Sequence, residues 1–239
     1  MTEIDSIAKK FNQYYKGLDG VEKDYKEAYK YAKKAVEQDS IQGTQLLAIC
    51  YEKGVGVEVD MNKAISLYSS LVDKDVEESM VSLGLIYNNS SYDDHNYQKA
   101  VDLFTRASEL GNVNAMVHLA NMYYISTKDR QFQFDFEKAA KYYKLAADKG
   151  DLYAAEKYAD MLVNGIGVTQ NKEEALRYYN IASPSEKVMI KIELLKNEEP
   201  ENELIQKVNE KLVKHNKLKR LKSHEDEIDW EWGDVFYFK

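Results

Sequence analysis

The side chains best suited to metal binding or nucleophilic catalysis are few and scattered in this chain of 239 residues. The four histidines fall at no metal-ligand spacing, at His95, His118, His215 and His224. The single cysteine, Cys50, excludes an internal disulfide and a cysteine-based zinc cluster. Its register matches that of Ile86, Met122 and Met161, so we interpret it as a small core residue, and His118 as a structural or surface histidine.

Two glycine-containing segments invite comparison with phosphate-binding loops. They are Gly54-Val55-Gly56 and Gly165-Ile166-Gly167. Neither follows a predicted strand, and neither is followed by the Gly-Lys-Ser/Thr of a nucleotide-binding loop, so both are predicted to be tight turns between helices. Acidic residues are plentiful, but their best positions are helix caps. The sequence therefore predicts no catalytic site, no metal and no cofactor.

Composition narrows the class of protein further. Hydrophobic residues make up 44% of the chain, enough for a core, and only 2 prolines leave room for uninterrupted helices. The net charge of -8 argues against general affinity for nucleic acid. The first ten residues lack the apolar region of a signal peptide, and the longest uncharged stretch, 79–92, is too short to span a bilayer. We expect an intracellular, cytoplasmic protein.

These residues are organised by an internal repeat. The pattern Asp/Asn-x-x-Lys/Glu-Ala occurs five times, ending at Ala28, Ala64, Ala100, Ala139 and Ala175, with spacings of 36, 36, 39 and 36 residues. A second marker keeps the same register, at Tyr15, Tyr51, Tyr87, Tyr123 and Leu162. Because both markers shift together, we place a three-residue insertion within 125–134.

Each repeat carries two helical stripes of apolar residues. The second stripe is exemplified by Ala64, Leu67, Tyr68 and Leu71, and the first by Thr44, Leu47, Ala48 and Tyr51. The Asp or Asn is predicted to cap the second helix, with Glu27 and Glu174 at the capping-box position. The third position of the first stripe is always small, which allows close approach of neighbouring helices. Such a helix pair cannot bury its apolar faces alone, so the pairs must stack into an all-α solenoid.

The segment Leu47-Ala-x-x-Tyr51-x-x-Gly54-Val-Gly56-Val-x-x-Asp60-x-x-Lys-Ala64 resembles the Sel1-like repeat family, within the tetratricopeptide-like superfamily. This resemblance implies a right-handed α-α superhelix of about five helix pairs over residues 5–183. We expect units at 5–40, 41–76, 77–112, 113–151 and 152–183. Units three and four depart from the family pattern, because 88–96 has no glycine and 125–134 is longer and aromatic.

The same resemblance implies a non-catalytic scaffold or adaptor that holds a protein or peptide partner in its concave face. Carried over by position, the concave residues would be Gln45, Ile49, Glu52, Val81, Leu85, Asn88, Val117, Asn121, Tyr124, Glu156, Asp160 and Val163. Val81, Leu85 and Val117 lie off the core stripe. They either mark a partner surface or are buried between units by helix curvature.

A weaker alternative comes from cysteine-rich bacterial relatives that resemble β-lactamase-like hydrolases. That subgroup has a cysteine pair in every repeat, whereas this chain has only Cys50, and no Ser-x-x-Lys plus Lys-Thr-Gly set is assembled. We therefore expect no small-molecule substrate.

Beyond residue 183 the period decays. We expect degenerate capping helices over 184–222, with one helix ending at Lys196 and another over 201–222. The basic stretch 211–222 could approach nucleic acid or an anionic membrane, which is the alternative function, although pairing with the acidic residues that follow is favoured. The tail 223–239 interleaves acids with aromatics, including the partner-binding candidates Trp230 and Trp232. It could form a hairpin, dock on a partner or fold back on the solenoid.

Overall fold

A computed structural model describes residues 3–89, 96–125, 134–182 and 185–196 of the chain. These residues form eleven helices and contain no strand. The helices are α1 (Glu3–Lys16), α2 (Tyr25–Val36), α3 (Ile41–Lys53), α4 (Met61–Val72), α5 (Glu77–Asn88), α6 (Tyr97–Glu109), α7 (Val113–Tyr124), α8 (Phe136–Asp148), α9 (Leu152–Asn164), α10 (Lys172–Ile181) and α11 (Glu186–Lys196). The predicted all-α solenoid is confirmed.

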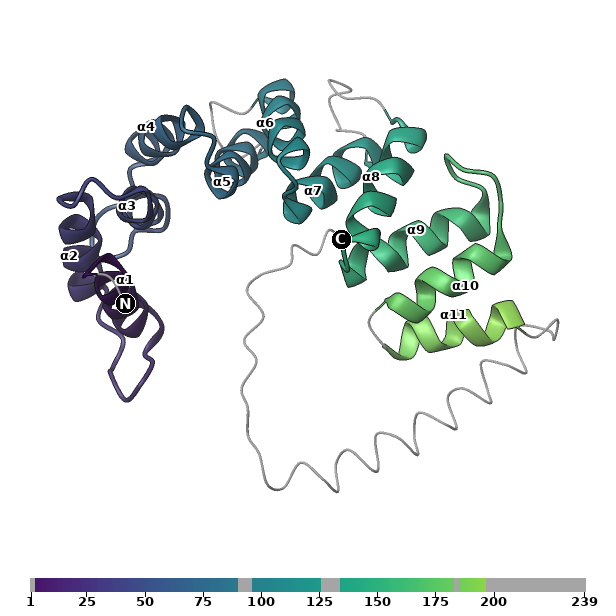
Figure 1. The fold of residues 1–239 in the computed structure, drawn as a ribbon, viewed down its shortest axis with the longest axis horizontal. Helices are drawn as coiled ribbons and strands as arrows, with labels where there is room; N and C mark the ends of the chain where they lie inside the picture. Colours follow the sequence, from purple (N-terminus) through teal and green to yellow (C-terminus); the bar gives the residue numbers. More distant parts are fainter. Residues whose placement is uncertain (1–2, 90–95, 126–133, 183–184, 197–239) are drawn as a thin grey trace.

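The helices stack in sequence order and trace an arc (Figure 1). Each helix packs mainly on its neighbours in the chain, as expected for a solenoid whose repeats contact only the adjacent repeats. Odd-numbered helices are the first helices of the units and even-numbered helices the second. In Figure 1, the first helices α3, α5 and α7 lie on the inner side of the arc, and α4 and α6 lie on the outer side.

The predicted caps of the second helices are confirmed in all five units. The side chains of Asp24, Asp60, Asn96, Asp135 and Asn171 accept backbone N–H groups of the first turn of α2, α4, α6, α8 and α10. These bonds satisfy donors that a helix start leaves without an intrahelical partner. Each N-cap therefore sets where its second helix begins.

Glu27 and Glu174 stand at the predicted capping-box position but do not accept the backbone N–H of the cap. In every unit the backbone N–H of the cap donates instead to a carbonyl near the end of the preceding helix. The acceptors are Tyr14, Tyr51, Tyr87, Tyr123 and Leu162, at distances of 2.9, 2.9, 2.8, 2.9 and 3.0 Å. With the donor already used, Glu27 pairs with Lys30, and Glu174 accepts from the Asn171 side chain at 3.3 Å.

The tyrosine marker has a second contact in the three middle units. The ammonium groups of Lys63, Lys99 and Lys138 lie over the rings of Tyr51, Tyr87 and Tyr123, at 5.0, 4.9 and 5.0 Å from the ring centroids. Each lysine stands three residues after its cap, where units one and five have a glutamate. A cation over an aromatic face is attracted by the ring quadrupole. The lysine therefore adds a side-chain contact to the backbone bond between the two markers.

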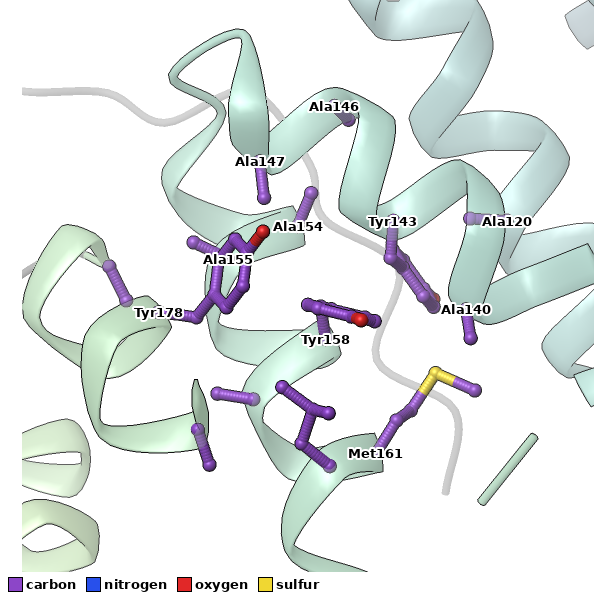
Figure 2. Packing of buried hydrophobic residues seen from close by; sticks show 14 of the residues in the cluster. Ala120, Ala140, Tyr143, Ala146, Ala147, Ala154, Ala155, Tyr158, Met161 and Tyr178 are labelled. Carbon is purple, nitrogen blue, oxygen red and sulfur yellow. The ribbon is translucent and has the colours of Figure 1, made fainter. Parts of the chain in front are cut away.

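The small residues of the first stripe are needed for close packing. Ala48, Ala120 and Ala159 are fully buried, and a Cβ placed on Gly84 would lie 2.7 Å from Cε1 of Phe104 in α6. Figure 2 shows the same style of packing around α8 and α9, where alanines surround Tyr143, Tyr158 and Tyr178. The rings of Tyr158 and Tyr178 meet edge to face, with 4.7 Å between their centroids. The alanines thus leave room for large aromatic rings from the adjoining helix.

The two Gly-x-Gly segments form turns between helices, as predicted. Gly54 and Gly165 end α3 and α9 in the left-handed conformation. Gly56 and Gly167 also have positive φ, and each lies against the start of the preceding second helix. A Cβ there would be 2.1 Å from the carbonyl oxygen of Tyr25 or of Phe136. The second glycine of each loop therefore permits contact with the unit before it.

The chain after unit five continues as α11, which confirms the predicted helix ending at Lys196. Its buried Val188 and half-buried Ile192 and Leu195 pack on the core of units four and five. No helix within the described ranges is long and apolar enough to cross a membrane. The expected helix over 201–222 and the tail 223–239 lie outside the described residues.

Candidate protein-binding face

The candidate face is formed by the first helices, whose N-caps give a common register. The caps of α3, α5, α7 and α9 are Ser40, Val76, Asn112 and Asp151. The fourth, seventh, eighth and eleventh residues after each cap form the core stripe. The predicted concave residues occupy the fifth, ninth and twelfth positions, and we name the set at the ninth position the concave row. The concave row consists of Ile49, Leu85, Asn121 and Asp160.

The first half of this face, formed by α3 and α5, holds three apolar and three polar predicted residues. Leu85 keeps 41% of its surface exposed, whereas Ile49 and Gln45 of α3 are half-buried. For Val81 the second of the two alternatives holds: only 9% of its surface is accessible, because it packs in the core of units two to four. Val117 is half-buried against the next core cluster. Helix curvature therefore covers Val81 and part of Val117, and Leu85 remains the accessible apolar residue of α5.

In the second half, formed by α7 and α9, the polar residues are already bonded within the chain. Asn121 accepts hydrogen bonds at Oδ1 from the hydroxyl groups of Tyr143 and Tyr153, at 2.6 and 3.2 Å. The ring of Tyr124 meets Tyr143 and Phe136 edge to face, at 6.2 and 5.6 Å between centroids. These contacts hold both candidates in one orientation. Asn88, the last residue of α5, is half-buried. Trp230 and Trp232 lie outside the described residues.

Tyrosine hydroxyl groups of the second helices reach the candidate face in three units. Besides the Tyr143 bond, Tyr68 donates to Glu52 at 2.7 Å and Tyr179 donates to Asp160. Burial, followed by the bonded carboxylate, raises the pKa of Tyr68 and of Tyr179 above the usual range. These bonds were not predicted, although tyrosine recurs at one register of the second stripe and Phe104 replaces it in unit three. The bonds tie the candidate face to the core.

The last part of the face is an ion-pair network between α9 and α11. The ammonium group of Lys191 lies 2.7 Å from a carboxylate oxygen of Glu156 and 2.7 Å from one of Asp160. Lys187 lies 3.7 Å from Glu156. Burial acts to lower the pKa of Lys191, but the hydrogen bonds to Asp160 and Glu156 outweigh it and raise that pKa. These two predicted concave residues therefore already bind a cation supplied by this chain.

The groups that could do chemistry lie apart from the candidate face. Cys50 is fully buried, and burial raises the pKa of its thiol to about 12, which keeps it protonated at neutral pH. The ring of His118 stacks on that of Phe104, with 5.1 Å between the centroids. Burial lowers the pKa of His118 below the usual value. Among the described residues, no group of three or more His, Cys, Asp or Glu side chains is placed to hold a metal ion. The structural interpretations of Cys50 and His118 are confirmed.

The stacked helix pairs and the bonds that connect them define an α-helical repeat protein. The chain belongs to the Sel1 repeat family, whose model matches residues 14–40, 44–75, 77–112, 113–151 and 152–183. Proteins of this family are generally scaffolds for protein interaction.

Solved structures agree with this fold. A Sel1 repeat protein from Oxalobacter formigenes is 24% identical, with a TM-score of 0.71 over 89% of this chain and 88% of that one. A protective antigen of uropathogenic Escherichia coli with an SLR fold is 23% identical, with a TM-score of 0.70 over 87% of this chain and 46% of that one. An immunity protein from Pseudomonas aeruginosa is 24% identical, with a TM-score of 0.51 over 76% of this chain and 65% of that one. These similarities concern the fold alone, and no curated protein matches the chain.

Proposed function

We propose that this protein is a non-catalytic scaffold that binds a protein or peptide partner along the concave side of its first helices. The observation that carries the proposal is the exposure of Leu85 in α5. The core stripe residues of α5 are buried at Met80 and Leu83, so packing of the repeat does not require a leucine at position 85. Single exposed leucines are ordinary on protein surfaces, and we single out Leu85 because its helix lies on the inner side of the arc (Figure 1), between the first helices that carry Ile49 and Val117.

The neighbouring positions suit the same role. Ile49 and Val117 extend the apolar surface to the units on either side, and Gln45 and Asn88 add polar groups beside it. Asn121 and Tyr124 are held by tyrosine and phenylalanine contacts, so they lose little conformational freedom when a partner binds. We include Trp230 and Trp232 in the proposal as aromatic anchors for the same or another partner.

Leu85→Glu tests the proposal, and Leu145→Glu is its matched control. Leu145 of α8 is 40% exposed, almost the same as Leu85, but it belongs to a second helix. Each full-length variant is used to capture partners from cell extract, and bound proteins are quantified by mass spectrometry. We expect the same partner to be retained by wild type and Leu145→Glu and reduced at least tenfold with Leu85→Glu.

Circular dichroism and thermal unfolding check that both variants fold, because both substitutions replace an exposed side chain. Retention of every partner by folded Leu85→Glu would refute the concave-side proposal. Equal loss with both leucine variants would refute it as well, because the effect would not depend on the face.

A further inference from the structure

The last described helix, α11, has the register of a first helix. The Oγ atom of Ser185 accepts from the Val188 N–H at 3.3 Å, and the Ser185 carbonyl accepts from the Met189 N–H at 3.0 Å, so Ser185 is the N-cap of α11. Val188 stands at the third position after this cap, where Ala115 of α7 and Ala154 of α9 are also buried. It packs in the core of units four and five. The side of α11 that faces the preceding unit is therefore covered as in a regular unit.

The core stripe of α11 is less covered than that of the other first helices. Its fourth position is Met189, which keeps 43% of its surface exposed, whereas Met80 and Met116 at the same position keep 0% and 4%. At the seventh position, Ile192 is half-buried, whereas Tyr158 of α9 is only 5% exposed. Among the described residues, no helix covers this side of α11 as the second helices cover α5, α7 and α9.

In a complete unit, the core stripe contacts the second helix of the same unit. A Cβ on Gly84, at the eighth position of α5, would lie 2.7 Å from Cε1 of Phe104 in α6. The ring of Tyr158, at the seventh position of α9, meets that of Tyr178 in α10. The exposed stripe of α11 is thus the surface on which the second helix of a sixth unit packs.

The sequence directly after α11 has the stripe of a second helix. In a second helix, the fourth, seventh, eighth and eleventh residues after the cap form the stripe, as Ala64, Leu67, Tyr68 and Leu71 do in α4. Counted from Glu201, these positions hold Ile205, Val208, Asn209 and Leu212. The positions that continue this spacing are polar: His215, Asn216 and Lys219. The stripe therefore fits a helix over 202–213, which has the 12 residues of α4.

The eighth positions of the two helices also suit each other. In units two to five, a small residue of the first helix is combined with an aromatic residue of the second: Ala48 with Tyr68, Gly84 with Phe104, Ala120 with Tyr143, and Ala159 with Tyr179. In α11 the eighth position is Glu193, which is too large to admit a ring, and the eighth residue after Glu201 is Asn209. An amide can donate to a carboxylate. The two departures from the repeat are therefore compatible with each other.

We propose that residues 202–213 form the second helix of a sixth unit and cover the exposed stripe of α11. The connection 197–201 has a usual length for two packed helices, and Pro200 within it cannot continue α11. The covering helix is shorter than the one expected over 201–222, because the apolar stripe stops at Leu212.

The proposal assigns a contact to each position of the stripe. Ile205, Val208 and Leu212 pack on the side of α11 that carries Met189, and Nδ2 of Asn209 donates to the carboxylate of Glu193. Burial of this apolar surface closes the last unit, which a solenoid needs at its end. The basic residues between 214 and 222 lie beyond the covering helix and are not required for its packing.

Met189→Glu distinguishes a covered stripe from an exposed one. If 202–213 cover the stripe, the substitution buries a charge, and the midpoint of thermal unfolding of the full-length protein should fall by roughly 5 °C. Leu145→Glu is the matched control, because Leu145 of α8 is 40% exposed. It should change the midpoint by about 1 °C at most. Equal midpoints for the two variants would show that the stripe is exposed in solution and would overturn the proposal.

Cross-linking identifies what covers the stripe. Glu193→Cys and Asn209→Cys are combined in the full-length protein, which is treated with a short bifunctional maleimide reagent. The native Cys50 is fully buried and does not compete for the reagent. We expect a cross-link within one chain, located by mass spectrometry. The control combines Glu193→Cys with Lys207→Cys, on the opposite side of the covering helix, and should give roughly tenfold less product.

Three outcomes contradict the assignment once circular dichroism has shown that the variants fold. Equal yields from positions 207 and 209 would mean that the segment is tethered near α11 without packing on it as a helix. Absence of the cross-link within one chain would mean that the segment does not cover the stripe. A covalent dimer from Glu193→Cys alone would mean that a second copy of the chain covers it instead.

Discussion

Units two and five join their helices through Gly-x-Gly segments, whereas units three and four have no glycine at that place. All four units nevertheless close with the same backbone bond, from the cap N–H to the carbonyl of Tyr51, Tyr87, Tyr123 or Leu162. The position of the second helix is therefore tied to the end of the first helix rather than to the path between them. The comparison teaches that the connection can vary in length and composition while the stack of helices is preserved.

The glycine segments also contact the preceding unit. Gly56 and Gly167 approach the carbonyl oxygens of Tyr25 and Phe136, at the start of the preceding second helix. In those two units the connection is part of the interface between units. Substitutions at the two glycines of one segment should therefore differ sharply in cost.

The largest effect is expected at the second glycine. Gly167→Ala would place Cβ 2.1 Å from the Phe136 oxygen at a φ of 67°, so steric overlap adds to backbone strain. We expect a loss of roughly 3 kcal/mol in the free energy of unfolding. Gly165→Ala has a similar φ of 65° but no atom closer than 3.7 Å, and should lose only about 1 kcal/mol. Urea unfolding of both variants measures the difference, and equal losses would contradict the role given to the interface.

The next largest loss of stability is expected from removing the N-cap of a second helix, which all units share. Asn96→Ala in unit three and Asn171→Ala in unit five each remove a side-chain acceptor from the start of a second helix. We expect each to lower the free energy of unfolding by about 1 kcal/mol. Because the cap is the same in both kinds of unit, the two values should agree within about 0.5 kcal/mol. A much larger loss in unit three, measured by the same urea titration, would mean that its connection depends more on the cap.

The smallest expected effect is a gain in stability, at Ser79. Ser79 of α5 is 1% exposed, and its hydroxyl has no hydrogen-bond partner in the described part of the chain. The same register holds Ala115 in α7 and Ala154 in α9. Ser79→Ala removes a desolvated polar group and should raise the free energy of unfolding by about 0.5 kcal/mol. A loss of stability in thermal and urea unfolding would indicate that the hydroxyl is bonded in solution.

The repeat, its register and its caps could be predicted because they depend on local patterns. Two markers that shift together across the insertion reflect one backbone bond between the cap and the tyrosine, although the sequence alone did not reveal that bond. Close packing could also be predicted from a local pattern, because the small residues Ala48, Gly84 and Ala120 stand at the same position of successive units.

The candidate face could be predicted only in part. Side-chain exposure there depends on how adjacent units pack, which buries Val81 in the core of units two to four and leaves Leu85 exposed. The Lys191 network depends on where α11 packs, beyond the regular repeat.

Site-specific photo-cross-linking tests the central claim most directly, because it reports contact at a single position of the full-length protein. A photoreactive phenylalanine analogue is incorporated at position 85 of α5 or, as the control, at position 145 of α8. If partners bind the concave side of the first helices, position 85 forms a covalent adduct with the partner captured by wild type, and position 145 does not. An adduct from position 145 alone would contradict the account.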